Sequence, residues 1–420
     1  MSGRPNLPTP FPKREGGAGD ASAVFSPSPL GGRVGEGGRF FDAVVIGAGP
    51  AGAVAARELA RRGCSVLLVE KAQFPRSKVC GCCINGAAIS TLKRLGLGGV
   101  LAAGVPLRNV RIGAGRHSAR VSVPGGVSLS REVFDAALVD EAVRAGVEFR
   151  TGVVAKLDGN LSGTERRSSI DVLVRGSGTE NGAGSGEDRV TARVAVLASG
   201  LTGGDAVPEA GSRIGAGATV PADTVPSFFE TGTIFMATGH GGYVGFVRVE
   251  DGRLDVAAAF DVAFVKARGG LGPAAQTVLS EVGWPQVPGF VELAWRGTPA
   301  LSRRPKIIAG ERWFAVGDAA GYVEPFTGEG MAWAVMSAAA LAPIAARGVQ
   351  EWSTSLTGEW ESTHRRLIGT RQRTCRIVSR VLRAPALTAL VVRALSAVPA
   401  LSRPVVRSLN RPALLLGARA

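Results

Sequence analysis

Residues 41–70 read FDAVVIGAGPAGAVAARELARRGCSVLLVE, and this stretch decides the fold of the chain. The apolar run at 41–46 predicts a strand, and residues 53–62 have the Ala, Leu and Arg content of a helix that Gly63 closes. A second, β-branched strand is predicted over 64–69. Strand, helix and strand in so short a stretch predict a βαβ unit with parallel strands.

The turn between the first strand and the helix carries the pattern Gly-x-Gly-x-x-Gly. Gly47 makes the tight turn, Gly49 lets the backbone approach a pyrophosphate, and Gly52 permits close packing of the helix. The helix N-terminus stabilises diphosphate charge, and Glu70, 18 positions after the last glycine, can accept hydrogen bonds from ribose hydroxyls. The combination predicts a dinucleotide site, with an ordinary glycine-rich turn as the alternative.

Further patterns predict more α/β structure and a second, sheet-rich region. The elements expected before the second region are a helix over 87–95 capped by Asn85, a hairpin-like turn at 124–126, a helix over 131–145, a strand over 147–157, a flexible loop over 158–188 and a strand over 190–198. An antiparallel sheet with one helix near 273–282 follows. A short buried strand at 312–316 and an Ala-rich helix at 328–347 complete this part of the chain.

A second glycine-rich motif lies far along the chain. Gly317-Asp318-Ala319-Ala320-Gly321 is followed by Pro325 and by Gly328-Glu329-Gly330. With the first motif, it resembles the FAD-binding domain of the p-hydroxybenzoate-hydroxylase type. The resemblance implies that Asp318 holds the ribityl chain and that the helix beginning near 328–330 points its positive end at the flavin's pyrimidine edge. A simple turn at Asp318 is the alternative.

A third element narrows the resemblance to geranylgeranyl reductase-like flavoproteins. Residues 74–83 read FPRSKVCGCC and are similar to that group's segment with a Pro-Arg, a Lys and a Cys-Gly pair. Arg131, with Phe134-Asp135 and Leu138, matches the group's arginine that lies along the FAD. Several features depart from the related patterns: Cys82-Cys83 after the Cys-Gly pair, Ala198-Ser199-Gly200 without the aspartate expected for direct NADPH binding, no Trp or Pro in 242–248, and no Trp-x-Trp-x-Ile-Pro motif of halogenases.

The resemblance implies a Rossmann-like α/β FAD-binding domain with an inserted antiparallel sheet domain and a helical tail. The expected cofactor is FAD, with NADPH or NADH as candidate electron donor. The expected cofactor-binding residues are Gly47, Gly49, Pro50, Ala51, Gly52, Glu70, Lys71, Arg76, Cys80, Gly81, Arg131, Val154, Gly317, Asp318, Ala319, Gly328, Gly330 and Met331. The expected segments are a disordered leader (1–38), the FAD domain (39–205 and 305–347), the substrate domain (206–304) and a basic helical region (348–420).

Cys80 and His240 are the candidate catalytic residues. Lys78 and Arg76 can lower the pKa of a nearby thiol, and His240, between two glycines, can supply a proton. The alternatives are small cysteines packed under the flavin and a solvated loop histidine. No metal is expected, since the three clustered cysteines and the three histidines lack ligand spacing.

Charge is distributed unevenly along the chain. The net charge is +15, yet residues 362–420 contain twelve Arg and no Lys, Asp or Glu. A uniformly basic nucleic-acid binder would look different, so no nucleic-acid partner is expected. Arg373, Arg376, Arg380 and Arg383 share one helical face that can lie on an anionic membrane or meet an acidic carrier protein. The alternative is a helix packed on the body with a solvated arginine face.

The cysteine content and the N-terminal sequence predict a cytoplasmic protein, either free or peripheral on the inner face of the membrane. Five cysteines are odd in number, and the N-terminus has no apolar signal region. The predicted function is an FAD-dependent oxidoreductase that reduces or dehydrogenates a small hydrophobic prenyl, polyketide or lipid-like substrate by hydride transfer through flavin N5. An FAD-dependent monooxygenase (hydroxylase) and a non-catalytic flavin electron-transfer protein are the alternatives.

Overall fold

The structure is a computed structural model that describes residues 33–35, 38–158, 168–176, 188–203, 206–324, 326 and 328–410. Its first sheet has the central order β18-β19-β10-β2-β3-β7, and β1, β8 and β9 join it off this path. The strands are β1 (Arg33–Gly35), β2 (Gly38–Ile46), β3 (Val66–Glu70), β7 (Glu148–Thr151), β8 (Val153–Leu157), β9 (Ile170–Gly176), β10 (Asp188–Leu197), β18 (Ala309–Gly310) and β19 (Trp313–Ala315).

The predicted βαβ unit is confirmed. β2 and β3 pair in parallel, with Ala43 opposite Val66, and α1 (Pro50–Ala60) connects them. Helix α1 packs with α2 (Gly86–Arg94), α3 (Arg131–Arg144) and α6 (Gly330–Gln350) around one apolar core. Asn85 caps α2 as predicted, since its side chain accepts from the backbone N–H of Ala88. Helix α6 is apolar and long enough to cross a membrane, but it is mostly buried as a core helix.

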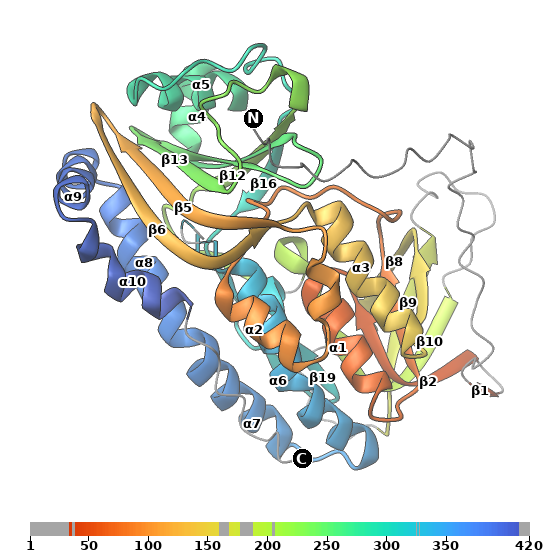
Figure 1. The fold of residues 1–420 in the computed structure, drawn as a ribbon. Helices are drawn as coiled ribbons and strands as arrows, with labels where there is room; N and C mark the ends of the chain where they lie inside the picture. The colour runs from red at the N-terminus through yellow and green to blue at the C-terminus, as the bar shows by residue number, and fades with distance from the viewer. Residues whose placement is uncertain are drawn as a thin grey trace, which may run out of the picture.

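A second, eight-stranded sheet lies beside the first sheet and is covered by two helices (Figure 1). In order, its strands are β16 (Arg296–Ala300), β12 (Ile214–Val220), β15 (Leu254–Phe260), β14 (Gly242–Arg248), β13 (Thr233–Gly239), β5 (Val105–Ala114), β6 (His117–Ser128) and β4 (Cys83–Ile84). The covering helices are α4 (Val262–Arg268) and α5 (Leu271–Glu281), whose apolar residues share a core with this sheet. A separate two-stranded pair joins β11 (Val207–Pro208) to β17 (Arg303–Arg304).

The second sheet draws on more of the chain than we predicted. β4, β5 and β6 come from residues 83–128, which we had assigned to the FAD domain, and β5 pairs with β13 in parallel rather than antiparallel. The predicted hairpin turn at 124–126 is wrong, because β6 runs through it and pairs with β5 across a register shift. The two glycines there form an irregularity within the strand, and the chain reverses instead at Gly115, whose φ is 53°.

Three other expectations need correction. The strand predicted over 147–157 is divided into β7 and β8 at Gly152, whose φ is 69°. The loop predicted over 158–188 contains β9, which pairs with β8 and β10; the rest of it, apart from 158, 168–169 and 188, lies outside the described residues. Most of the predicted leader lies outside them too, but Arg33–Gly35 forms β1 against β2.

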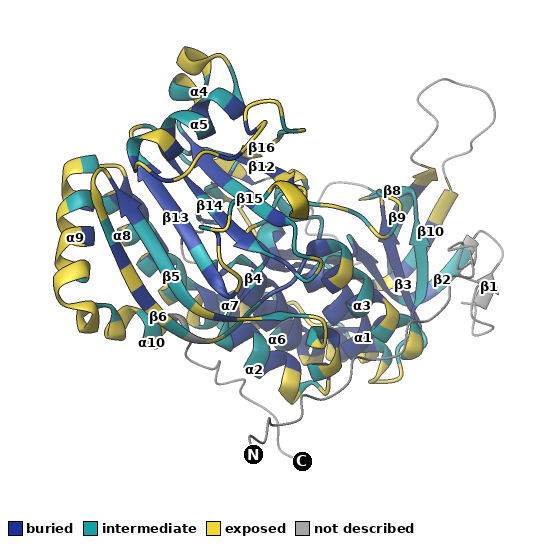
Figure 2. Ribbon diagram, turned by 45° about the horizontal axis from the view of Figure 1, so that its top comes forward, coloured by how far each residue is buried: buried dark blue, intermediate teal, exposed yellow. Residues whose placement is uncertain are grey.

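The chain ends in a series of helices, as the prolines of the tail predict. They are α7 (Ser355–His364), a π turn (Arg365–Gly369), α8 (Thr370–Leu382), α9 (Pro385–Ala397), the short 3-10 turn η6 (Pro399–Ser402) and α10 (Arg403–Leu409). In Figures 1 and 2, α8, α9 and α10 lie against the second sheet at the β5–β6 side. Shorter 3-10 segments are η1 (Gly98–Leu101), η2 (Gly200–Thr202), η3 (Ala222–Thr224) and η4 (Gly317–Ala320).

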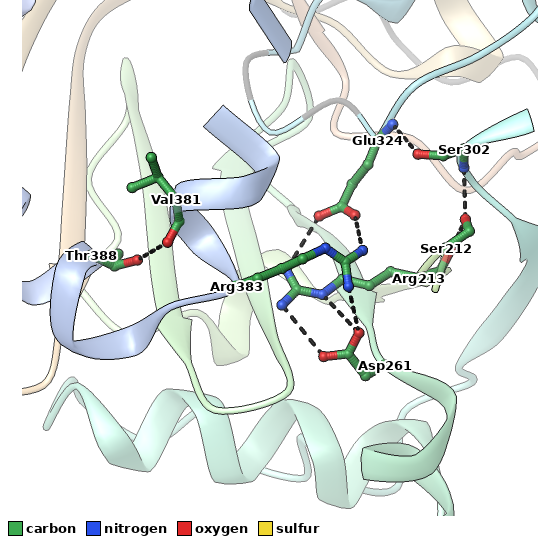
Figure 3. A network of polar contacts seen from close by, with 8 residues as sticks. All are labelled: Ser212, Arg213, Asp261, Ser302, Glu324, Val381, Arg383 and Thr388. Atoms are coloured by element: carbon green, nitrogen blue, oxygen red, sulfur yellow. Dashed lines mark hydrogen bonds and ion pairs between the residues drawn. The ribbon is translucent and has the colours of Figure 1, made fainter. Parts of the chain in front are cut away.

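A buried ionic network fixes α8 to the body (Figure 3). Arg213, at the start of β12, binds Glu324 and Asp261 at 3.3 Å each. Arg383, at the end of α8, binds the same two carboxylates at 3.4 and 3.2 Å. Because Arg213 and Glu324 are almost fully buried, each charge depends on the others for compensation. The arginine face predicted to be free is therefore partly used to hold the tail in place.

Candidate functional site

One cavity of about 1190 Å³ runs between the two sheets and beneath the tail helices. Its polar end begins where β2 and β3 finish, at the β2–α1 turn and Glu70. Its apolar end lies between the second sheet and α8, α9 and α10. The site therefore has two chemically different halves.

The three glycines of the first motif differ in the space around them. Gly47 has φ 103°, and a Cβ there would collide with the carbonyl oxygen of Ala198. A Cβ on Gly52 would collide with the carbonyl oxygen of Gly47, so Gly52 lies behind the cavity wall. A Cβ on Gly49 would instead lie 3.6 Å from the nearest heavy atom, an Nη2 of Arg76, on the cavity side. Gly49 thus leaves an open approach to the N-terminus of α1.

Glu70 is held in a defined orientation at the end of β3. Its Oε2 accepts from the backbone N–H of Ala48 at 3.0 Å, and its Oε1 accepts from that of Ala72 at 3.2 Å. The exposed Lys71 donates to Thr202 at 3.4 Å. Both residues line the cavity, and so does Val154, which is 37% exposed. Glu70 Oε2 also lies 3.6 Å from Arg76 Nη2, and Glu70 lines the cavity, where a ribose-binding acid is required.

Two arginines face the open side of Gly49. Arg131 begins α3 and forms a bidentate ion pair with Asp135, at 2.8 and 2.7 Å. Arg76 Nη2 lies 3.5 Å from Asp135, while its buried Nε has no hydrogen-bond partner among the described residues. A buried, unpaired donor beside a helix N-terminus fits the diphosphate of a dinucleotide.

The second glycine motif packs against the first at the cavity wall. A Cβ on Gly317, whose φ is 61°, would lie 2.9 Å from the Cβ of Ala51, so η4 packs directly on α1. Asp318 lines the cavity, and burial raises its pKa although Lys78 and Arg131 oppose that shift. Ala319 is buried behind this wall and does not line the cavity. These two distant motifs therefore come together, as the resemblance to FAD-binding domains implies.

The N-terminus of α6 also reaches the site. Gly328, Gly330 and Met331 line the cavity, and Gly328 has φ 67°. Glu329 is buried away from it and accepts from Arg371 at 2.9 Å. The positive end of α6 is therefore presented beside the space that Asp318 borders.

The segment at 80–83 forms a compact thiol cluster in the cavity. Cys82 has φ 47°, a left-handed conformation that folds the segment back on itself. A hydrogen bond from the Cys82 thiol, with the charge of Arg131, lowers the pKa of Cys80 to about 5 against the effect of burial. The pKa of Cys82 is raised by that same hydrogen bond and by burial, and burial first of all raises the pKa of Cys83. Cys80 is thus the anionic member of the cluster.

Asp255 of β15 is a site residue that we did not predict. It lines the cavity near the thiol cluster, and burial, followed by the charge of Cys80, raises its pKa well above the usual value. Its buried Oδ2 has no hydrogen-bond partner in the described part of the chain. The signal available in the sequence was a lone acid in the otherwise apolar strand LDVAAAF. Among the described residues, no group of three His, Cys, Asp or Glu is arranged to hold a metal.

His240 is not brought to the site. It lies at the turn between β13 and β14, with its side chain 76% exposed and its Nδ1 3.2 Å from Glu281. It does not line the cavity, so a catalytic role for His240 has no geometric support. The flanking glycines indicated a turn and not a site, which is the alternative that we had considered.

The apolar half of the cavity has two walls. The second sheet contributes Val110, Ile112, Ile234, Met236 and Tyr243, and the tail contributes Val378, Leu382, Val392, Leu395 and Val406. Tyr243 packs edge-on against Phe326 at 5.0 Å, and burial raises its pKa, so it carries its proton at neutral pH. We did not predict that the tail would line the site, because helix amphipathicity does not identify the surface that covers the apolar side.

Comparisons with known proteins agree with this geometry. Residues 41–181 match the family described as FAD binding domain. Menaquinone reductase of Mycobacterium tuberculosis is 43% identical over 84 residues, which are 20% of this chain and 21% of that protein. Digeranylgeranylglycerophospholipid reductase 1 of Methanothermobacter thermautotrophicus is 28% identical over 363 residues, covering 78% of this chain and 83% of that protein. The match to menaquinone reductase thus spans about a fifth of that enzyme.

Solved structures share the overall fold. A flavoprotein/dehydrogenase from Cytophaga hutchinsonii superposes with a TM-score of 0.71 at 18% identity, covering 89% of this chain and 93% of that one. The p-nitrophenol 4-monooxygenase PnpA of Pseudomonas putida gives 0.68 at 16% identity, covering 90% and 99%. At such identities the similarity establishes the fold alone, and the chemistry has to be inferred from the residues of the site.

Proposed function

Since residues 41–181 belong to the FAD-binding-domain family and the chain has the fold of p-hydroxybenzoate-hydroxylase-type flavoproteins, we propose that the protein is an FAD-dependent reductase of a long, apolar substrate. The observation that carries the proposal is the continuity of the cavity. The groups suited to a dinucleotide open into an apolar channel under the tail helices. An isoprenoid or other lipid-like chain has the shape and polarity that this channel accepts.

Residues of the polar half would hold the cofactor. The N-terminus of α1 and Arg76 suit the diphosphate, Glu70 the adenosine ribose and Asp318 the ribityl chain. The N-terminus of α6 suits the electron-rich pyrimidine edge of the flavin. When bound, FAD supplies a hydride donor or acceptor at N5.

Reduction of a carbon–carbon double bond also needs a proton for the second carbon. Asp255 is suited to supply it, because burial raises its pKa and so favours the protonated carboxyl, and its Oδ2 has no hydrogen-bond partner among the described residues. Cys80 holds a negative charge beside Asp255, which favours the protonated acid. The mostly apolar lining favours a proton donor supplied by the protein.

The related enzymes suggest which substrates to test. One curated relative is a menaquinone reductase and another reduces a digeranylgeranyl glycerophospholipid. The FAD-loaded protein is reduced with dithionite without oxygen and then mixed with menaquinone or with a geranylgeranyl lipid. We expect flavin reoxidation and a product that has gained two hydrogen atoms at a carbon–carbon double bond of its isoprenoid chain, which mass spectrometry of the air-reoxidised product distinguishes from reduction of the quinone ring. Dithionite makes the outcome independent of whether NADPH or NADH is the natural electron donor.

Two outcomes would contradict the proposal. Reoxidation by oxygen alone, with an oxygen atom inserted into an aromatic substrate, would assign a monooxygenase. Electron exchange with a carrier protein and no turnover of any small substrate would assign an electron-transfer flavoprotein. Either result would leave FAD binding intact and exclude the reductase.

The role of Asp255 has its own test. Asp255→Asn keeps the shape but cannot donate the proton as an acid, so we expect alkene reduction to fall by about 100-fold, within the usual range for loss of a general acid. Flavin affinity and the rate of dithionite reduction should not change. A matched variant, Asp251→Asn, alters an exposed acid in the turn before the same strand and should retain full activity. Equal activity of the two variants would exclude Asp255 as the proton donor.

A further inference from the structure

The outer face of the last helices is unusually apolar. Seven of the thirteen exposed large apolar side chains in the described part of the chain lie between residues 377 and 405. They are Ile377 at 60% exposure, Leu387 at 44%, Leu390 at 61%, Val391 at 40%, Val398 at 50%, Leu401 at 57% and Val405 at 44%. Figure 2 shows the exposed character of α9. We call these seven residues the tail patch; so dense a group marks an interaction surface.

Positive charge surrounds the tail patch. Residues 362–420 contain twelve arginines and no acidic residue. Arg371, Arg376 and Arg383 are paired with carboxylates of the body. Arg393, Arg403 and Arg407 are exposed on α9 and α10, and the described chain forms no ion pair with them. An apolar surface rimmed by unpaired arginines is complementary to an anionic, amphiphilic partner.

The tail patch also borders the mouth of the cavity. Ile377, Val391, Leu401 and Val405 are exposed to solvent and at the same time line the cavity. Other residues of α9 and α10, such as Leu395 and Val406, line its interior. The same two helices therefore present one side to the outside and the other to the channel.

The geometry of the helices suits a surface and not a span. α9 has 13 residues and α10 has seven, against about 20 needed to cross a bilayer. The chain bends by 118° between them, so the two cannot form one straight spanning segment. Short, bent, basic and apolar helices are typical of proteins that lie in the interface plane of a membrane.

We propose that α9 and α10 dock the protein on an anionic lipid bilayer and place the mouth of the cavity against it. The apolar residues of the tail patch enter the boundary between headgroups and acyl chains, and the free arginines bind the headgroups. An apolar substrate can then pass from the bilayer into the channel without crossing water. The docking itself does not depend on the proposed reductase activity.

The test uses the full-length, FAD-loaded protein and vesicle cosedimentation. Vesicles of phosphatidylcholine alone are compared with an equal mixture of phosphatidylcholine and phosphatidylglycerol. We expect binding to the anionic vesicles that weakens with salt, and little binding to the neutral ones. Val398→Ser in the tail patch should weaken binding by about fivefold, because the apolar contact with the acyl region is lost. The separate variant Arg403→Gln should also weaken binding to the anionic vesicles at low salt.

Matched controls keep the result specific. Val207→Ser changes a valine on β11 that is 53% exposed and outside the tail patch, and it should bind vesicles as the parent protein does. Arg61→Gln removes an exposed arginine after α1 and should also have no effect. Circular dichroism and the flavin spectrum report whether each variant is folded.

Three results would overturn the proposal. They are equal binding to neutral and anionic vesicles, equal binding by the Val398→Ser and Val207→Ser variants, and no binding to either kind of vesicle. A parent protein that is dimeric in solution and becomes monomeric through Val398→Ser, without vesicle binding, would assign the tail patch to a second copy of the chain. Because no step requires turnover, loss of vesicle binding is distinguishable from failure of the reductase assignment.

Discussion

The effect of adding one Cβ atom distinguishes the glycine that borders the cofactor site from the glycine that packs behind it. Gly49, at the N-cap of α1, and Gly52, in the first turn of that helix, are three positions apart, and the space around each indicates a different role. A side chain on Gly49 would enter the cradle, whereas one on Gly52 would collide with the backbone of Gly47. Gly49 has φ −73° and ψ −177°, angles that alanine adopts without strain.

We therefore expect opposite behaviour from two alanine variants. Gly49→Ala should fold with an unchanged melting temperature but bind FAD at least about tenfold more weakly, a loss of about 1.4 kcal/mol, because its methyl group occupies the approach to the diphosphate. Gly52→Ala should lower stability by about 2 kcal/mol or more, because α1 must move away from the turn. Thermal unfolding of the apoprotein and flavin titration measure the two effects. Similar profiles for both variants would contradict this division of roles.

At this scale the glycine motifs, Glu70 and Asp318 were predictable, because each has a local sequence pattern. Asp255 was not, because its importance comes from burial and from Cys80, which lies 175 positions earlier in the chain. His240 had a suggestive local sequence but is located at the wrong end of a strand. Local chemistry in a sequence identifies candidates, and tertiary structure decides which of them meet.

Helix α7 shows how one element can make stability depend on pH. His364 lies at its end, 8% exposed, with its ring 5.5 Å from that of the buried Trp360. Burial lowers the pKa of His364 from 6.5 to about 4. The folded state therefore favours the neutral imidazole, and this element carries a built-in sensitivity to acid.

The sign and the size of the effect follow from the two pKa values. Above pH 6.5 both states hold a neutral imidazole; between pH 6.5 and about 4 the unfolded chain binds a proton that the folded chain does not. Stability should thus fall by up to about 3 kcal/mol as pH drops through this window. Denaturant unfolding at a series of pH values should show that His364→Phe lacks this part of the loss. Parallel pH profiles for the parent and the variant would show that His364 is not the group responsible.

Among the elements, those with long, mostly apolar or Ala-rich segments were predicted well. β2, α1, α3 and α6 are examples, because each buries a continuous apolar face. The Pro-Gly-Gly of β6 misled the prediction, since these residues also suit an irregular strand that is held in place by its neighbour β5. The pairing partner decides such cases, and the local sequence of residues 124–126 does not indicate that they pair with β5.

At the scale of the whole molecule, the tail is both a wall of the cavity and a structural brace. Arg383 joins α8 to carboxylates from two other parts of the fold, and Arg213 lies buried between the same carboxylates. Composition alone identified a basic tail but not its acidic partners, because Asp261 and Glu324 have no distinguishing sequence pattern. The arrangement predicts that the tail detaches when the network is broken.

Arg383→Gln should release the end of α8 and destabilise the protein by about 1 kcal/mol, since the arginine is partly exposed. Arg213→Met should cost about 3 kcal/mol or more, because it removes the buried partner of Glu324. Limited proteolysis should cut the tail faster in both variants than in Arg373→Gln, which alters an exposed arginine of the same helix. Uniform cleavage rates would show that the network does not hold the tail.

The interleaving of the two sheets limits how this molecule can be divided. β5 and β13 are hydrogen-bonded neighbours, yet the strands of the first sheet from β7 to β10 lie between them along the chain. A chimera made by transplanting residues 206–304 alone would carry β12 to β16 and leave β4, β5 and β6 with the host. Because the tail helices form the other wall of the cavity, substrate preference is exchanged between relatives only when both sheet segments and the tail move together, so recombination within this architecture is constrained to matched sets of fragments.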